Sequence, residues 1–252
     1  NSTGSSNTAG GTDSLKANTT GASNTALGYL SLRNNTTASD NTAVGHQALF
    51  TNATGANNVA IGKNALYYNT ASSNTAVGQL AMTNTTTGTN NTAVGQNSLT
   101  ANTTGGANIA IGVNSLDSNT TGADNTGIGF QTLCTLTNGN RNTAVGKNAL
   151  LNMSGSGDRN NTAIGHSAGT NVSTGFNLTL LGYSAEPSSG TATNEITLGD
   201  ANVTTLRMGN GVNIVSGGAL VGGGGGVGSV KAYVNFNGTG TVSVTNSANV
   251  SS

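Results

Sequence analysis

One short motif, Asn-Thr-Ala-Val-Gly, recurs along the sequence at an almost constant spacing, and it is intact at residues 41–45, 74–78, 91–95 and 142–146. Most successive copies lie 17 residues apart. A repeat unit of this length is too short for ankyrin-type or helical-hairpin repeats, which need more than ~30 residues. We therefore expect each unit to form one coil of a solenoid. The closing glycine of each unit, which we call the coil glycine, recurs every 17 residues apart from one step of 16 and one of 19: Gly11, Gly28, Gly45, Gly62, Gly78, Gly95, Gly112, Gly129, Gly146, Gly165, Gly182 and Gly199.

Two apolar positions are restricted in every coil. The residue before the coil glycine is Val, Ile or Leu in eleven of twelve copies, and the residue two positions earlier is Thr, Val or Ile in all of them. Because residues two apart share one face of a strand, these two positions lie on the same face. A second apolar position follows four residues after the coil glycine and holds Leu or Met from Leu15 to Leu150. The pattern predicts two short strands and two bends per coil. It also predicts that the aliphatic residue before the glycine is buried, so that Val94→Asp would bury an unpaired carboxylate.

Asparagine and glycine mark the bends. Asn stands four residues before the coil glycine in ten copies, and a second bend reads Asn-Thr-Thr-Gly at 18–21, 102–105 and 119–122. Both residue types adopt positive φ readily, so the bends can be tight. Stacking of identical coils would place Asn on Asn, and we expect their amides to form hydrogen-bonded ladders.

Composition excludes several classes of protein. Only 6% of residues are charged, and the eight acidic and eight basic side chains cancel. This balance argues against a nucleic-acid partner and against a polybasic membrane patch. No stretch approaches the ~20 apolar residues of a membrane span, so we expect no membrane insertion. The fixed register of the aliphatic positions argues against a disordered polar tract.

The chain divides into three predicted segments. Residues 1–208 form the repeat array, which is regular over 17–169 and decays over 170–208. The coil leucine is replaced by Gly169, at the end of the regular part, and by Glu186. One residue is missing around Tyr67-Tyr68, and two are added near 154–157, where we expect a bend to bulge outward. Residues 209–228 form a glycine-rich linker or chain crossing. Residues 229–252 contain a hairpin that begins a C-terminal tip module, and we expect this module to be cut off at Ser252. Because the numbering also starts inside a repeat, we expect the sequence to be a piece of a longer chain.

No set of side chains indicates catalysis or metal binding. His46 and His166 follow coil glycines seven coils apart, at ~34 Å, and cannot share a metal within one chain. The carboxylates are scattered over different coil positions, and no nucleophile motif or phosphate loop occurs. We predict no catalytic, cofactor-binding or metal residues, no cofactor and no enzymatic activity. Cys134 is expected to be a free thiol. Aromatic residues at Tyr29, Phe50, Tyr67-Tyr68 and Phe130 are interpreted as packing against neighbouring coils, with sugar stacking as the alternative.

A single coil buries too little to stand alone. Each coil offers one aliphatic residue, one Leu and two small residues against ~1–2 kcal/mol of backbone ordering per residue. Lengthwise packing against copies of the same chain would bury the remaining apolar stripe, and every coil would make the same contact. We therefore expect a homotrimer.

The array resembles a known family. The Asn-Thr-Ala-Val/Ile-Gly run followed by Ala-Leu is similar to the head repeats of trimeric autotransporter adhesins, and the same coil recurs in bacteriophage tail fibres. This resemblance covers roughly residues 7–207 and implies a left-handed parallel β-roll of about twelve coils, with three chains side by side. The segments 195–199, 203–207 and 230–241 look like the distal part of phage tail fibres.

Three functions remain open from the sequence. The first is a segment of a phage tail fibre in the virion, which carries receptor recognition at its tip and contacts a host cell-surface glycan or protein and other virion proteins. The second is a trimeric adhesin on a bacterial surface. The third is an ice-binding solenoid, against which the adjacent bend threonines argue, because a flat ice face requires Thr-x-Thr on one strand. The sequence does not indicate which residues contact a receptor.

Overall fold

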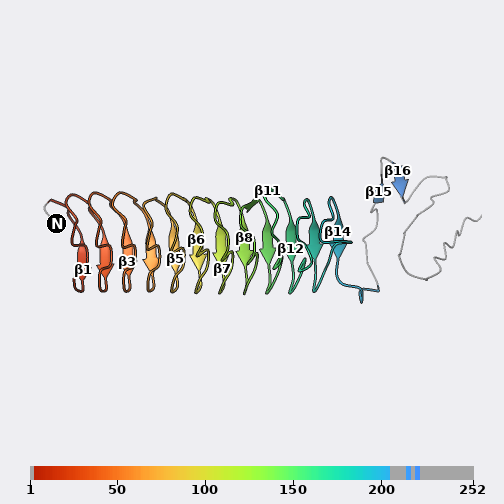
Figure 1. Cartoon of the computed structure of the whole chain (residues 1–252), viewed down its shortest axis with the longest axis horizontal. Helices are drawn as coiled ribbons and strands as arrows, with labels where there is room; N and C mark the ends of the chain where they lie inside the picture. Colours follow the sequence, from red (N-terminus) through yellow and green to blue (C-terminus); the bar gives the residue numbers. More distant parts are fainter. Residues whose placement is uncertain (1–2, 205–213, 217–218, 222–252) are drawn as a thin grey trace, which may run out of the picture. The chain divides into compact units, whose positions relative to one another are not determined.

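The computed structural model describes residues 3–204, 214–216 and 219–221. These residues contain strands and turns and no helix, and residues 3–202 form a parallel β-solenoid (Figure 1). Twelve strands joined by eleven turns of chain stack side by side into one parallel sheet. The predicted all-β class and parallel β-solenoid are therefore confirmed. The sheet contains, in spatial order, β1 (Thr8–Gly10), β2 (Thr25–Leu27), β3 (Thr42–Val44), β4 (Val59–Ile61), β5 (Thr75–Val77), β6 (Thr92–Val94), β7 (Ile109–Ile111), β8 (Thr126–Ile128), β10 (Thr143–Val145), β12 (Thr162–Ile164), β13 (Thr179–Leu181) and β14 (Ile196–Leu198).

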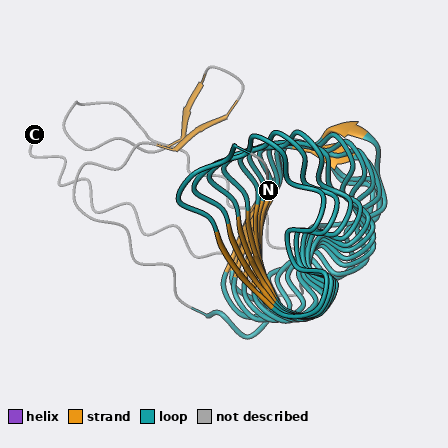
Figure 2. Ribbon diagram, turned by 90° about the vertical axis from the view of Figure 1, so that its left-hand side faces the viewer, coloured by secondary structure: helices purple, strands orange, loops and turns teal. Residues whose placement is uncertain are grey.

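Each coil has one strand in this sheet, and the register aligns equivalent positions of neighbouring coils. In β6 and β7, Thr92 pairs with Ile109, Ala93 with Ala110 and Val94 with Ile111. Seen along the solenoid, the strands of this sheet superpose on one side of the coil (Figure 2). A separate two-stranded sheet joins β9 (Gly139–Asn140) and β11 (Gly157–Asp158) at one bend.

The prediction of a second strand around the coil leucine is wrong. The leucines lie in turns and adopt positive φ, for example 53° at Leu49 and Leu99, and their side chains are fully buried. Positive φ is unusual for a bulky residue. Burial of a whole leucine side chain contributes about 1.5–3 kcal/mol, which offsets the ~1–2 kcal/mol cost of a left-handed residue.

The core consists of the coil leucines and the small residue at the centre of each strand. Ala26, Ala43, Ala60, Ala76 and Ala93 are fully buried. Near the C-terminal end the pattern changes in a compensated way. Gly169 replaces the coil leucine, and Leu180 replaces the strand alanine. A Cβ at Gly169 would lie 2.8 Å from Leu180 Cδ1. Leu180 therefore occupies the space that the missing leucine leaves.

Two ladders of asparagine line the interior and confirm the predicted amide stacking. In the first ladder, Asn41 donates from its backbone N–H at 3.0 Å and from Nδ2 at 3.2 Å to Asn24 Oδ1. The second ladder stands three residues after the coil leucine and includes Asn35, whose Nδ2 donates to Asn18 Oδ1 at 2.8 Å. This second ladder ends at Asn119, whose Oδ1 is buried without a partner, because Leu136 of the next coil has no side-chain donor.

The coil glycines are required by contact as well as by conformation. Gly45 has φ of 130°, and a Cβ there would lie 2.8 Å from the carbonyl carbon of Gly62. Because the glycines stack directly on one another, a side chain at this position would collide with the backbone of the next coil. This contact explains why the glycine recurs in every copy.

Both irregular coils differ from the regular ones at their bends. Asn52 Nδ2 donates to the carbonyl three residues ahead, Gly55 O, whereas Asn69 Nδ2 donates to Ala71 O, two residues ahead. The missing residue thus lies in the bend after Asn69, and not at Tyr67-Tyr68. The longer coil bulges outward as predicted, since residues 156–158 are exposed.

Two short strands follow outside the solenoid. β15 (Ile214–Ser216) and β16 (Ala219–Val221) pair antiparallel within the segment predicted as linker or crossing. The rest of that segment and the hairpin predicted within 229–252 lie outside the described residues.

Candidate functional site

The outward face of the twelve-stranded sheet carries a regular row of exposed aliphatic side chains, and we call it the apolar face. It is formed by the first and third residues of each strand, because the second residue points into the core. The prediction that the third residue is buried is wrong for a single chain. Its exposed members are 36–44% accessible: Leu27, Ile61, Val94, Ile111, Ile128, Ile164, Leu181 and Leu198.

Threonine accompanies these aliphatic residues on the apolar face. The first strand position holds half-buried Thr in most coils, such as Thr42 and Thr92, but Ile109 and Ile196 are exposed there. Two columns, one mostly of Thr and one of Val, Ile or Leu, therefore run side by side along the sheet in register. No carboxylate or cation interrupts either column between β2 and β14.

A second exposed column starts where each strand ends, at the residue after the coil glycine, and we call it the flanking column. Both histidines lie in it and are exposed, at β3 and β12, seven strands apart as the sequence indicated. Among the described residues, no three His, Cys, Asp or Glu side chains gather in a way that could hold a metal ion. The column contains Thr12, Tyr29, His46, Lys63, Gln79, Gln96, Val113, Phe130, Lys147, His166, Tyr183 and Asp200.

The histidines of the flanking column contact aromatic rings on the neighbouring coil. The ring centroids of Tyr29 and His46 are 5.3 Å apart, and those of His166 and Tyr183 are 5.6 Å apart. Lys147 Nζ lies 5.9 Å from the centroid of Phe130. These contacts run along the column, from one coil to the next.

Phe50 and Tyr67 pack between neighbouring coils, as interpreted from the sequence, whereas Tyr68 contacts Tyr67 of its own coil. Phe50 and Tyr67 stack with centroids 5.0 Å apart, and Tyr67 meets Tyr68 edge-on at 4.6 Å. The guanidinium of Arg33 lies 5.9 Å from the Phe50 centroid.

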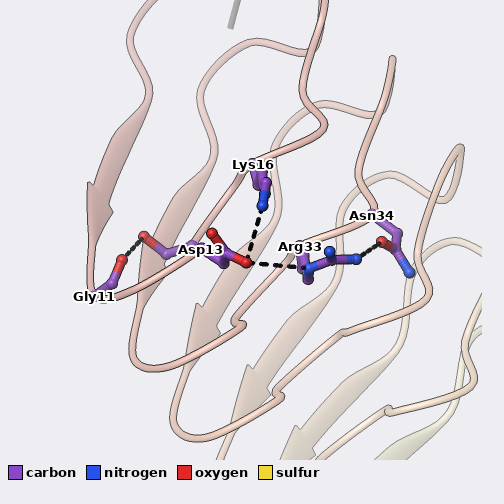
Figure 3. Close-up of polar contacts among 6 residues, drawn as sticks. Gly11, Asp13, Lys16, Arg33 and Asn34 are labelled. Carbon is purple, nitrogen blue, oxygen red and sulfur yellow. Dashed lines mark hydrogen bonds and ion pairs between the residues drawn. The ribbon is translucent and has the colours of Figure 1, made fainter.

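Several carboxylates of the solenoid bind side chains or backbone groups near them. Asp13 accepts from Lys16 at 3.1 Å and lies 3.7 Å from Arg33 Nε (Figure 3). Asp158, in the bulged coil, pairs with Arg141. Glu186 accepts from Thr170 Oγ1 and Asn171 N, and Glu195 accepts from Ser188 N and Oγ.

Cys134 and Asp117 occupy the same position of adjacent coils. Burial raises the pKa of Asp117 above its ordinary value, and a hydrogen bond from Thr100 partly opposes that shift. Burial, followed by the nearby charge of Asp117, raises the pKa of the Cys134 thiol. A thiol with a raised pKa is a poor nucleophile at neutral pH. Cys134 makes no disulfide within the described part of the chain.

The bend threonines use their hydroxyls to join coils. Thr36, Thr86, Thr103 and Thr120 each donate Oγ1–H to a carbonyl of the next coil at 3.0–3.1 Å. Their hydroxyl protons are thus engaged within the chain.

Comparison with known proteins found no match. No family model, no curated protein and no solved structure matches this chain. The described residues contain no apolar helix of membrane-spanning length.

Proposed function

We propose that this chain is a non-enzymatic segment of a homotrimeric attachment fibre, and that the fibre is a phage tail fibre. The observation that carries the proposal is the apolar face. Side chains such as Val94 and Ile111 remain more than a third exposed on the isolated chain, and they line up over the whole sheet. Exposed aliphatic side chains gathered along one face are typical of an interface between proteins.

The identity of the partner follows from the regularity of the face. Every coil from β2 to β14 presents the same pair of strand positions, Thr or an aliphatic residue at the first and an aliphatic residue at the third, at the parallel-sheet spacing of ~4.8 Å. Another copy aligned in parallel offers the same spacing and the same chemistry along its full length. Closed cyclic symmetry then removes every free copy of the face. The choice of three chains comes from the resemblance of the coil to trimeric adhesin heads.

A fibre role agrees with how the side chains are used. Eleven steps between strands give a rod of roughly 50 Å from the described coils. Asn and Thr side chains form hydrogen bonds between coils, for example Asn91 with Asn74 and Thr103 with Thr120. Such a rod can hold a recognition element at a distance from its attachment point, and three parallel chains give avidity to weak contacts.

The alternative is that this chain belongs to a trimeric adhesin of a bacterial surface, built from the same coil. Mass spectrometry of purified virions and of bacterial outer-membrane fractions separates the two. Peptides such as residues 17–33 in virions support the tail fibre, and their presence in bacterial surface fractions without phage contradicts it.

Ice binding is favoured by one observation, the regular column of Thr on the flat apolar face. Against it, the neighbouring column is aliphatic, and the bend threonines donate their hydroxyl protons within the chain. A thermal-hysteresis measurement on the purified chain tests this second candidate. Our proposal predicts no hysteresis, because the apolar face is covered in the trimer.

A further inference from the structure

The flanking column contains the same three residue types twice, in mirrored order. Tyr29, His46 and Lys63 follow one another on consecutive coils, and Lys147, His166 and Tyr183 do so further along. The chain has only two histidines, and each lies between a tyrosine and a lysine of adjacent coils. We call these two groups the first and second triads.

Both triads are exposed and arranged alike. Tyr29 and Tyr183 are 50% and 64% accessible, and the histidines and lysines are exposed as well. In each triad the imidazole lies against the tyrosine ring, at 5.3 Å in the first and 5.6 Å in the second. These contacts hold an aromatic surface beside the polar ring nitrogens, with a lysine one coil away.

Within the flanking column, the triads carry the cationic side chains and stand among no carboxylates up to Tyr183. No carboxylate occurs in the flanking column between Thr12 and Tyr183, and the first is Asp200, one coil beyond the second triad. Within the described chain, neither lysine nor histidine of the triads takes part in an ion pair, since the three ion pairs involve Lys16, Arg33 and Arg141. Lys147 Nζ lies over the Phe130 ring, but neither ammonium group has an anionic partner among the described residues, so both can pair with an anion from outside.

We propose that each triad is a binding site for a carboxylate-bearing sugar. An exposed tyrosine ring packs against the apolar C–H face of a pyranose, as aromatic side chains do with flat apolar surfaces. The lysine ammonium pairs with the sugar carboxylate. An imidazole nitrogen exchanges a hydrogen bond with a sugar hydroxyl; in His166 this nitrogen is Nε2, because Nδ1 lies 3.0 Å from Ser167 Oγ. A triad spans two coil spacings, about 10 Å, which suits a disaccharide.

The proposal deepens the proposed attachment function and rests on it, but it needs no trimer to be tested. The triad side chains project from the turn after each strand, and not from the apolar face itself. Lys63 and Lys147 lie five strands apart, roughly 24 Å along the solenoid. Two weak sites at this distance on each chain would act together on a surface covered with acidic glycans.

The test is calorimetric titration of the full chain with two acidic probes. These are 3′-sialyllactose and an oligosaccharide of alternating glucuronate and N-acetylglucosamine, each compared with its carboxyl-reduced form. We expect binding of at least one acidic probe, weaker binding of its reduced form, and loss of affinity at high salt. The double variant Lys63→Gln/Lys147→Gln should weaken binding by about twofold to fivefold, and Tyr29→Ala/Tyr183→Ala by about twofold to tenfold.

The matched control is Lys16→Gln/Arg33→Gln, which changes the net charge equally but lies outside the flanking column. This variant should bind as the unaltered chain does. The inference is overturned if neither acidic probe binds, if the reduced forms bind equally well, or if the control weakens binding as much as the lysine variant. The mass of the same samples separates the two proposals: a monomer that binds the acidic probe contradicts the trimer alone, and a trimer that binds neither probe contradicts the triads alone.

Discussion

The side-chain carbonyl of Asn91 accepts two hydrogen bonds from Asn108, one from its backbone N–H at 2.9 Å and one from its Nδ2 at 3.1 Å. Asn91 Nδ2 in turn donates to Gly105 O at 2.9 Å and to Asn74 Oδ1 at 3.2 Å. One buried amide thus joins three successive coils, so the first asparagine ladder fills part of the core and also binds the coils together.

Asn91→Ala should destabilise the solenoid strongly. It leaves the buried backbone N–H of Asn108 without its partner, at about 1–3 kcal/mol for a buried group left unsatisfied, and it removes the side-chain link to Asn74. Asn108 Nδ2 still donates to Gly122 O, and Gly105 O still accepts from Asn102 Nδ2. The expected result is a lower thermal midpoint and faster hydrogen exchange in the coils around residue 91. Gln96→Ala, at an exposed position, is the control and should change neither. Equal melting of the two variants would contradict a structural role for the ladder.

Asn91→Asp adds a pH dependence to the same position. The buried carboxylate would have a folded pKa above its unfolded value, because burial disfavours the charged form. The variant is therefore least destabilised below the unfolded pKa of ~3.9 and loses stability as pH rises through the folded pKa. Thermal midpoints of Asn91→Asp and the unaltered chain from pH 3 to pH 8 measure this. A pH-independent difference would mean that the side chain is not buried.

The coil glycine is expected to be irreplaceable for two reasons that can be separated. At Gly95, φ is 134°, and a Cβ would lie 2.6 Å from the Gly112 carbonyl, whereas Gly157 has φ of 76° with no atom within 4 Å of a Cβ. Gly157→Ala should cost only the conformational strain, about 1–2 kcal/mol. Gly95→Ala should cost more than ~3 kcal/mol because the backbones collide. Similar midpoints for the two variants would show that stacking of the glycines is looser than described.

Because the coil leucines adopt a left-handed backbone conformation, replacing one of them by isoleucine should cost more stability than usual. Leu-to-Ile changes in cores usually cost less than ~1.5 kcal/mol. Leu99 has φ of 53°, which a β-branched side chain strongly disfavours, whereas Leu180 lies in β13 without positive φ. Leu99→Ile should therefore lower the thermal midpoint clearly more than Leu180→Ile. The opposite order would support the second strand that the sequence pattern predicted.

Asp117 should make the protein less stable at neutral pH than an amide would. Burial is the main cause that raises its pKa above 3.8, so the folded state disfavours the charged form. The stability of the unaltered chain relative to Asp117→Asn is highest when the Asp117 carboxyl is protonated, and it falls as pH rises through the folded pKa. Asp117→Asn should melt higher at pH 7, with the difference disappearing below about pH 4. Because Asp117 also raises the pKa of Cys134, the variant should react faster with iodoacetamide at pH 8. Unchanged melting and alkylation would contradict both shifts.

The sequence predicted the coil, its stacking and its ladders, because a repeated unit shows by substitution what each position tolerates. It could not predict which strand face is inward. Ala93 and Val94 both suit a buried strand, and the choice depends on the turn, where Leu99 at positive φ fills the interior and leaves room only for alanine. The larger residue of the strand is consequently the exposed one.

The triads were harder to recognise from the sequence. His46 and His166 were placed correctly after their coil glycines, but their tyrosine partners are 17 residues away along the chain and become neighbours only through stacking. The signal that identifies them is the composition of one coil position read down the whole array.

The Val94→Asp variant tests whether Val94 lies on a surface between chains or in the core of a single chain. On a single chain the carboxylate would reach water, because Val94 is 36% exposed, whereas Ala93→Asp would bury it completely. We expect Val94→Asp to keep its β-sheet circular dichroism and to lose self-association, and Ala93→Asp to lose the folded spectrum. Loss of folding in both variants would place Val94 in the core of the chain.

The mass of the full chain in solution tests the central claim most directly. Sedimentation equilibrium at micromolar concentration should give three times the chain mass of 24.6 kDa, falling to one chain mass for Val94→Asp. A single mass of 24.6 kDa for the unaltered chain across the concentration range would contradict the account.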